Sequence, residues 1–404
     1  MKKMKQALHR LAYAGFSALA AVFFMPLLWL IRPLVSVKIV CIQGHRIGHL
    51  AHDFGSIVLL RQSEKGRHAY VVFTPPVANA YIRDVYAECM TIIEHARLFD
   101  FVLSSVPVME AWGIYVEPPY THNAYATFSG NEKVLGLPKN VESQGAELLE
   151  SIGIPRDAWF VAFHSRDAQY FQQRFPNERL EYHDFRNSRV ETYLKAAEQI
   201  ARKGGFAFRM GTRSSPPLPA DRHPRVIDYA TEQSNALLDF YLCLKSRFIL
   251  ANSSGLYAVG TMAGVPVAAA NMAPLFTMPI TRNDLFIPKL LKRRKDGRIL
   301  NFLEVANVGA GEFYRLEQYE KQGLQVVDNT EDEIADLCEE MFERIAGKEP
   351  PPDGKANQEA FRRFVQEHHP EIIEFGDISY RFLERHPYLL PWQTDTTEGA
   401  RDTA

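Results

Sequence analysis

Apolar and polar segments alternate along the second half of the chain in the order expected of an open α/β sheet. Short apolar runs of strand length are separated by segments in which apolar residues recur at helical spacing. This succession is typical of a parallel sheet covered by helices. Strands are expected at 159–163, 206–210, 226–228, 247–251 and 265–270. Helices are expected at 188–202, 234–244, 255–263 and 331–345.

The first half carries a weaker form of the same pattern. Residues 79–97 have helical spacing, and apolar runs of strand length occur at 37–42, 57–60, 70–73 and 99–103. The predicted fold class is therefore α/β, with one open sheet in each half. A proline-rich linker is expected at 348–354, then a helical tail over 357–385 and a disordered end from about residue 395.

The N-terminal segment differs from the rest of the chain in its hydropathy. Residues 12–31 contain no charged side chain, and their length is about the 20 residues that a helix needs to cross a hydrocarbon core. A cleavable signal peptide is the alternative, but the apolar run is longer than its usual core and no small-x-small site ends it. The sequence therefore predicts a membrane-anchor helix over 1–36, with lipid as its partner.

The topology of this anchor is left open by the sequence. Basic residues flank the apolar run on both sides, so the positive-inside rule does not choose an orientation. Pro26 interrupts the run and would kink a helix. A single span is one arrangement, and a helix that breaks at Pro26 and returns to the same face is the other.

Length, charge and cysteine content narrow the class of protein. The 404 residues suffice for two ordinary domains, and a net charge of −2 lacks the basic excess typical of nucleic-acid binding. The four cysteines form no CxxC pair, so neither a zinc site nor a disulfide framework is indicated. The expected divisions are the anchor at 1–36, a first domain at 37–150, a second at 151–347, and a linker and tail at 348–404.

The segment Asn252-Ser253-Ser254-Gly255 joins a predicted strand to a predicted helix. The free N–H groups and the dipole of a helix N-terminus favour an anion, and serine hydroxyls can donate to phosphate oxygens. In open parallel sheets, ligands bind just outside the carboxyl ends of the strands. The segment therefore predicts a phosphate-binding turn; the alternative is an ordinary serine N-cap followed by a glycine.

The surroundings of this turn resemble the donor-binding half of GT-B glycosyltransferases. The helix and strand before it and Gly264-Val265-Pro266-Val267 after it follow that pattern. More specifically, the chain resembles a bacterial glycosyltransferase family associated with surface-polysaccharide biosynthesis, and three further motifs, at 46–50, 164–167 and 184–187, carry the resemblance. The resemblance implies two Rossmann-like domains and glycosyl transfer. It names neither donor nor acceptor.

Several polar residues at strand ends are candidates for holding the donor. Arg166 and Arg186 suit a diphosphate because a guanidinium presents several donors in one plane. No Asp-x-Asp triplet occurs, so a metal-independent site without cofactor is expected. The other candidates in the second half are His164 for phosphate or ribose, Arg209 for phosphate, Asp184 to orient Arg186, Asn187 in the same motif, and Asp228 and Tyr229 for the base of the nucleotide. A basic run at 289–298 is expected to be solvated, or to face anionic lipid.

The loop after the first strand is the candidate source of a catalytic base. Inverting transfer requires a group that takes a proton near neutral pH, and His49 is preferred, with His45 and Asp53 as alternatives. Arg46 and Gly48 are placed beside the donor phosphates. A structural role for the loop histidines remains an alternative.

Together these features predict transfer of a sugar from a nucleotide sugar to a carbohydrate or lipid-linked acceptor. The reaction is expected at the cytoplasmic face of the inner membrane, because nucleotide sugars are cytoplasmic. Two rivals remain. One is a nucleotide-sugar 2-epimerase, and the other is a non-catalytic GT-B-like scaffold of a polysaccharide assembly complex.

Overall fold

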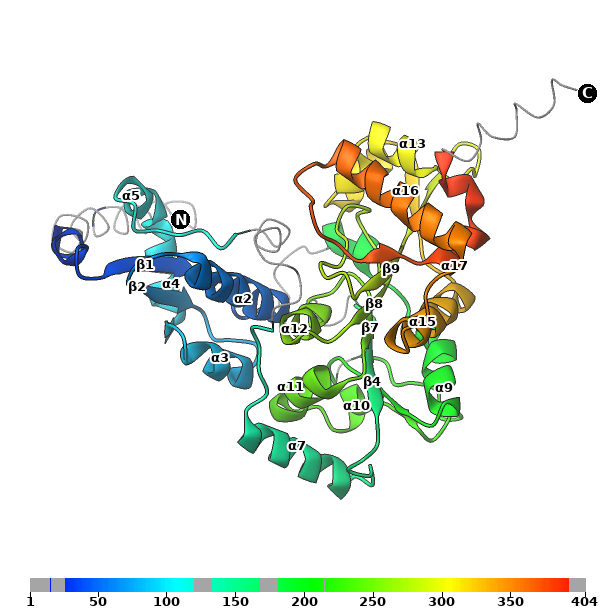
Figure 1. Cartoon of the computed structure of the whole chain (residues 1–404), viewed down its shortest axis with the longest axis horizontal. Coiled ribbons are helices and arrows are strands. Elements are labelled where there is room, and N and C mark those ends of the chain that lie inside the picture. The colour runs from blue at the N-terminus through cyan, green and yellow to red at the C-terminus, as the bar shows by residue number, and fades with distance from the viewer. Residues whose placement is uncertain (1–14, 16–25, 120–132, 168–180, 214, 392–404) are drawn as a thin grey trace, which may run out of the picture. The chain divides into compact units, whose positions relative to one another are not determined.

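The computed structural model describes residues 15, 26–119, 133–167, 181–213 and 215–391 (Figure 1). The chain divides into two compact units, residues 1–124 with 133–138 and residues 125–132 with 139–404. Most of the predicted anchor lies outside the described residues. Within them, no helix is both long enough and apolar enough to span a membrane.

The first unit contains a parallel sheet of three strands in the order β1-β2-β3. A parallel bridge between Ile39 and Tyr115 adds the chain at residue 115 on the other side of β1. The strand order therefore reverses at β1, as it does in a Rossmann half. Its elements are β1 (Ser36–Cys41), α2 (Ile47–Ser63), β2 (His68–Thr74), α3 (Ala80–Ala87), β3 (Thr91–Glu94), α4 (Ala96–Ser104) and α5 (Val106–Ala111).

Three predictions for the first half are wrong. Residues 57–60 belong to α2, where Ile57, Val58 and Leu59 are all buried and so conceal the helical period. The segment 79–97 contains β3 between two helices, and 99–103 lies in α4. The strands predicted at 37–42 and 70–73 are confirmed as β1 and β2.

The second unit contains a sheet of seven parallel strands in the order β12-β9-β8-β7-β4-β5-β6. Counted from β4, the first six strands have the 3-2-1-4-5-6 order of a dinucleotide-binding fold, and β12 is added at one edge. The order reverses between β4 and β7. The predicted α/β class, with a parallel sheet in each half, is confirmed. The strands are β4 (Phe160–His164), β5 (Phe206–Arg209), β6 (Val226–Ile227), β7 (Ile249–Ala251), β8 (Val267–Met272), β9 (Leu285–Pro288) and β12 (Asp377–Ile378), with a separate antiparallel pair β10 (Leu290–Arg293) and β11 (Leu324–Val327).

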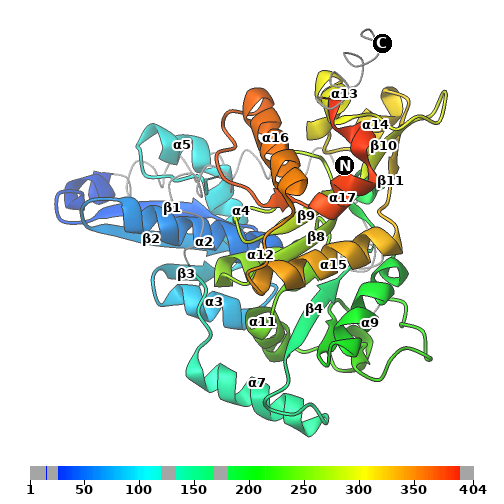
Figure 2. The ribbon, with the colours of Figure 1, turned by 45° about the vertical axis from the view of Figure 1, so that its right-hand side comes forward.

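Helices cover both faces of this sheet. The helices α9 and α15 lie side by side on one face, and α11 and α12 lie on the other, as Figures 1 and 2 show. The α-helices are α7 (Lys139–Ser151), α9 (Leu194–Arg202), α10 (Tyr229–Glu232), α11 (Ala236–Lys245), α12 (Leu256–Ala263), α13 (Phe302–Asn307), α14 (Leu316–Lys321), α15 (Glu331–Ile345), α16 (Pro352–His368) and α17 (Tyr380–Arg385). The 3-10 helices are η1 (Glu181–Arg186), η2 (Val190–Tyr193), η3 (Ala310–Glu312) and η4 (Pro387–Leu389).

The helices and strands of the second half agree closely with those predicted from the sequence, apart from two segments. The strands predicted from 159 to 270 are confirmed, and α15 matches the predicted helix 331–345. The helical tail predicted at 357–385 is not continuous, because α16 and α17 are separated by β12, which pairs in parallel with β9. The helix predicted at 188–202 begins later, because the 3-10 helix η2 follows Arg189 and α9 starts at Leu194.

Candidate functional site

Two segments leave adjacent central strands at the point where the strand order of the second unit reverses. Residues 165–167 follow β4, and residues 252–255 follow β7. Carboxyl ends of parallel strands lie at one edge of a sheet, and ligands of this fold bind where the order reverses. These two segments and the residues that contact them form the candidate site.

Asn252 ties three segments of the site together and is fully buried. Its Oδ1 accepts a hydrogen bond from the backbone N–H of Arg166 at 3.0 Å. Its Nδ2 donates to the carbonyl oxygen of Arg186 at 3.1 Å and to Oγ of Ser188 at 2.9 Å. The Asn252 amide is therefore occupied inside the protein, where it fixes the position of the turn.

Arg186 lies directly against the turn. Its Nε donates to the carbonyl oxygen of Ser253 at 3.0 Å and to the Ser253 hydroxyl at 3.2 Å. The same hydroxyl donates to the carbonyl oxygen of Ala273 at 3.0 Å. Ser253 is thus held from both sides, by the arginine and by the chain after β8.

Arg166 is buried beside the segment 183–187. Its Nη1 donates to the carbonyl oxygen of His183 at 3.0 Å and to Oδ1 of Asn187. The Asn187 amide in turn donates to Asp184 at 2.8 Å. The structure therefore brings the two predicted motifs, 164–167 and 184–187, into one hydrogen-bonded network with the turn.

Lys289 belongs to this network and was missed by sequence reasoning, which assigned it to a solvated basic run. Its Nζ donates to the carbonyl oxygen of Asn187 at 2.5 Å and to Asp328 at 2.6 Å. Burial lowers the pKa of Lys289 from its ordinary value. The available signal in the sequence for a buried Lys289 was its position between apolar neighbours, directly after the strand β9.

Ser254 differs from the neighbouring polar residues, whose side chains form hydrogen bonds. The residue is 4% exposed, and its hydroxyl has no hydrogen-bond partner in the described part of the chain. The helix α12 begins two residues later, with Gly255 as its N-cap residue, no side-chain cap and no acidic residue in its first turn. Buried polar groups normally have partners, so a buried hydroxyl beside an uncapped helix N-terminus is suited to an anionic oxygen.

Close packing places the middle of α12 against the start of β7. A Cβ atom at Gly260 would overlap the end of the Ile249 side chain, so the glycine lets α12 lie against the strand without moving that side chain. The position of the helix axis sets the direction of the N–H groups in the first helical turn.

His164 ends β4 at the same edge of the sheet. Its Nδ1 lies 3.0 Å from the carbonyl oxygen of Met210, so Nδ1 carries the proton that it donates there. Burial lowers the pKa of His164 and favours the neutral ring. Nε2 is then the unprotonated nitrogen.

The structure does not bring Arg209, Asp228 and Tyr229 into this network. Arg209 and Asp228 form a buried ion pair at 3.1 Å, and the second Asp228 oxygen accepts from the N–H of Leu218 at 2.8 Å. The buried Tyr229 hydroxyl donates to Asp239 at 2.8 Å. These side chains hold the loops around β5 and β6 in place, and their predicted ligand contacts stay predictions.

In the first unit, two of the candidate catalytic groups contact each other. His49 Nδ1 lies 2.8 Å from Asp53 Oδ2, one helical turn along α2, and both side chains are partly exposed. A carboxylate on one ring nitrogen orients an imidazole and leaves the other nitrogen to exchange a proton. Arg46 directly precedes α2, Gly48 lies in its first turn, and His45 lies in the loop after β1.

No protein-family model and no curated protein matches the chain. Among solved structures, it is similar to a glycosyl transferase family 9 protein from Veillonella parvula DSM 2008, with 11% identity, a TM-score of 0.46, and coverage of 76% of this chain and 97% of that one. It is also similar to E. coli ADP-heptose lps heptosyltransferase II (14% identity, TM-score 0.43, 63% and 90% coverage). A third similar structure is that of E. coli heptosyltransferase WaaC with ADP, with 10% identity, a TM-score of 0.35, and coverage of 62% of this chain and 90% of that one. Likeness at this level carries no information on the substrate of this chain.

Proposed function

We propose that the chain is a glycosyltransferase and that the turn 252–255 receives the diphosphate of a nucleotide-sugar donor. The observation that carries the proposal is the Ser254 hydroxyl, buried without a partner in the described structure at the N-terminus of α12. A phosphate oxygen would accept from this hydroxyl and from the first-turn N–H groups.

The charges around the turn favour the same ligand. Arg186 contacts Ser253, and Arg166 is tied to the turn through Asn252. In glycosyl transfer, negative charge develops on the leaving diphosphate, and positioned positive groups that face it lower the barrier. In this proposal the two guanidinium groups and the helix N-terminus supply the positive charge, so transfer proceeds without a metal ion.

The proposed base is His49. Its ring is held by Asp53, an arrangement that supports removal of a proton from an acceptor hydroxyl. The acceptor in the proposal is a carbohydrate or a lipid-linked sugar of cell-surface polysaccharide synthesis.

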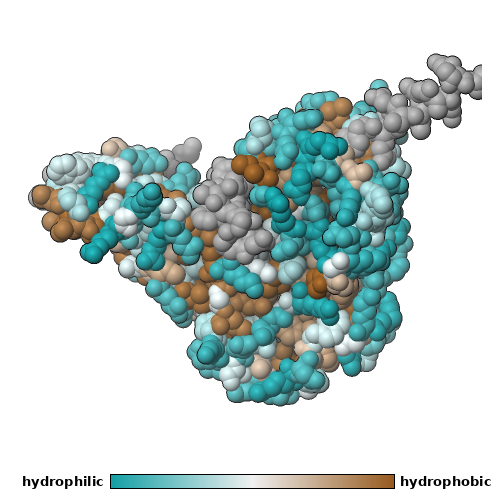
Figure 3. Space-filling view, viewed as in Figure 1, coloured by the Kyte–Doolittle hydropathy of each residue, from teal (hydrophilic) through white to brown (hydrophobic). Residues whose placement is uncertain are grey.

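We also propose that the first unit works against the cytoplasmic face of the inner membrane. Residues 26–31 are helical, and Leu28 packs against the small core of the first unit. Leu27, Trp29, Leu30 and Leu34 are between 57% and 76% exposed, and Figure 3 shows hydrophobic surface at this end of the first unit. Exposed apolar groups beside Arg32 and Lys38 suit an anionic bilayer surface.

In a flotation assay with phosphatidylglycerol vesicles, Trp29→Ser with Leu30→Ser is expected to reduce co-flotation; unchanged flotation would contradict this assignment.

The donor site is tested by titrating the full chain with UDP, GDP, ADP and CMP and with Arg166→Lys and Arg186→Gln variants. We expect one nucleotide to bind saturably and each variant to weaken it, because charge-assisted bonds to phosphate contribute about 1.5–3 kcal/mol. Arg189→Gln is the matched control, since Arg189 is nearby and its side chain is 77% exposed. Full affinity in both variants would remove the phosphate assignment, and failure of every nucleotide to bind would favour a non-catalytic scaffold.

A further inference from the structure

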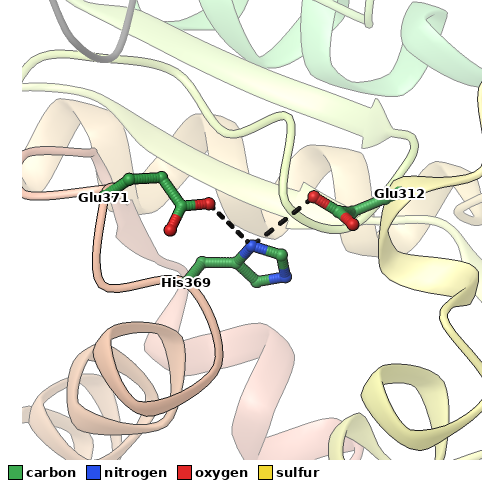
Figure 4. Close-up of side chains that lie close together, drawn as sticks. All are labelled: Glu312, His369 and Glu371. Carbon is green, nitrogen blue, oxygen red and sulfur yellow. Dashed lines mark hydrogen bonds and ion pairs between the residues drawn. The ribbon is translucent and has the colours of Figure 1, made fainter.

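Three potential metal ligands meet in the second unit, at a distance along the chain from the turn 252–255. Glu312 ends η3, and His369 and Glu371 follow α16. His369 Nδ1 lies 3.0 Å from Glu371 Oε1 and 3.5 Å from Glu312 Oε1, and one ligand atom from each residue falls within 4.8 Å of the other two. Figure 4 shows both carboxylates directed at the same ring nitrogen.

The imidazole is held in position by packing. The His369 side chain is only 14% exposed, and its ring centroid lies 4.0 Å from that of Phe276. Gly311 makes room for Phe276, because a Cβ atom at Gly311 would overlap the phenyl ring, and the Gly311 carbonyl accepts from the Phe276 N–H at 3.1 Å. Nδ1 is therefore aimed at the carboxylates before any ligand binds.

Two carboxylates face one imidazole at this position. No lysine or arginine forms an ion pair with Glu312 in the described ranges. A divalent cation would neutralise both carboxylates at once. Both glutamate side chains are more than half exposed, so each can rotate toward a shared ion.

The spacing of the ligand atoms suits a small tetrahedral ion. Bonds of about 2.0–2.1 Å in tetrahedral geometry place ligand atoms about 3.3 Å apart. The separations of 3.0 and 3.5 Å from His369 Nδ1 lie on either side of that value. One imidazole with two carboxylates suits Zn²⁺ better than Mg²⁺, which prefers oxygen ligands and water.

We propose that Glu312, His369 and Glu371 bind a Zn²⁺ ion that joins η3 to the chain after α16. The ion takes the lone pair of Nδ1, whose proton is released to solvent while the neutral ring keeps a proton on Nε2. Three protein ligands leave a fourth position for water. The ion links segments far apart in the sequence, so it stabilises the fold by closing a long loop.

The test is calorimetric titration of the untagged, metal-free full chain with ZnCl₂, together with thermal unfolding in the presence and absence of Zn²⁺. We expect one saturable site and a higher unfolding temperature with the metal. Glu312→Gln and Glu371→Gln should each weaken the site by at least the roughly 10–100-fold that loss of an outer-shell partner costs. The test uses these two exposed glutamates because His369→Ala would also remove packing on Phe276.

His368→Ala is the matched control, because the His368 ring nitrogen is turned to the Phe364 carbonyl instead. It should leave Zn²⁺ affinity unchanged. Absence of saturable binding, or binding that both glutamine variants leave intact, would overturn the proposal and assign His369 a purely ion-paired role. The readout is independent of nucleotide binding, so its failure would not touch the proposed transferase function.

Discussion

The backbone N–H of Arg166 donates a 3.0 Å hydrogen bond to the side chain of Asn252. This bond joins the residue two positions after β4 to the residue directly after β7, across the point where the strand order reverses. The turn 252–255 and the segment that carries Arg166 are therefore joined directly by a side-chain to backbone hydrogen bond.

Asn252→Ala is expected to destabilise the protein and to abolish nucleotide binding. The change removes three hydrogen bonds and leaves buried donors and acceptors unpaired, for a loss of about 2–4 kcal/mol in the free energy of unfolding. Urea unfolding measures the loss. The control is Asn307→Ala at the exposed end of α13, which should change stability by less than about 0.5 kcal/mol. Equal stability of the two variants would show that Asn252 does not hold the turn.

His49→Ala should lower kcat by about 10²–10⁴-fold, the usual contribution of a general base, and leave donor affinity unchanged. Asp53→Asn should lower kcat less, because it removes only the group that orients the ring. Initial rates of nucleoside diphosphate release measure both. His68→Ala is a matched control, since His68 also lies beside a carboxylate, Glu64, at 3.7 Å. A His49→Ala enzyme with normal kcat would move the base to another residue, such as His45 in the loop after β1.

Glu340 should make the stability of the protein fall as pH rises. Burial raises the pKa of this α15 carboxyl from 4.5 to about 7. Between these values the folded protein keeps a proton that the unfolded chain releases, so the stabilisation is complete below pH 4.5 and is lost through pH 7. Between about pH 5 and pH 8, the unmodified protein should therefore lose on the order of 3 kcal/mol more unfolding free energy than the Glu340→Gln variant loses.

Urea unfolding at the two pH values measures this effect. The amide introduced by Glu340→Gln would keep an oxygen for the N–H of Tyr380, and the Ser379 hydroxyl can turn to accept from the new NH₂ group. The control is Glu339→Gln, whose carboxylate pairs with Lys203 at the surface. If Glu340→Gln and the unmodified protein show the same pH dependence, the Glu340 carboxyl titrates normally.

The sequence predicted elements well where one face of a helix or strand is buried. Residues 331–345 carry a clear helical period and have the same bounds in the structure. Residues 57–60 were misread because α2 buries consecutive side chains, which mimics a buried strand. The strand β12 has two residues and pairs with β9, far away in the chain, so local pattern could not reveal it.

The motifs of the candidate site could be predicted from the sequence, but the contacts between their side chains could not. The motifs at 164–167, 184–187 and 252–255 meet because strand order places the ends of β4 and β7 side by side. The ion pair of Arg209 and Asp228 follows from the register of β5 and β6, in which Phe208 lies opposite Ile227. Register is set by the folded sheet, so the sequence offered these two residues as ligand contacts instead.

Ser254→Ala, compared with Ser253→Ala, tests the central claim most directly. The Ser254 hydroxyl has no partner in the described structure, so its removal should leave unfolding free energy unchanged while weakening nucleotide binding roughly tenfold, the effect of about one lost hydrogen bond. Ser253→Ala loses bonds to Ala273 and Arg186 and should destabilise the fold. Calorimetric titration of the Ser254→Ala protein with the preferred nucleoside diphosphate is the measurement: a tenfold weaker Kd at unchanged stability is the predicted result, and an unchanged Kd would contradict the assignment of the turn to the diphosphate.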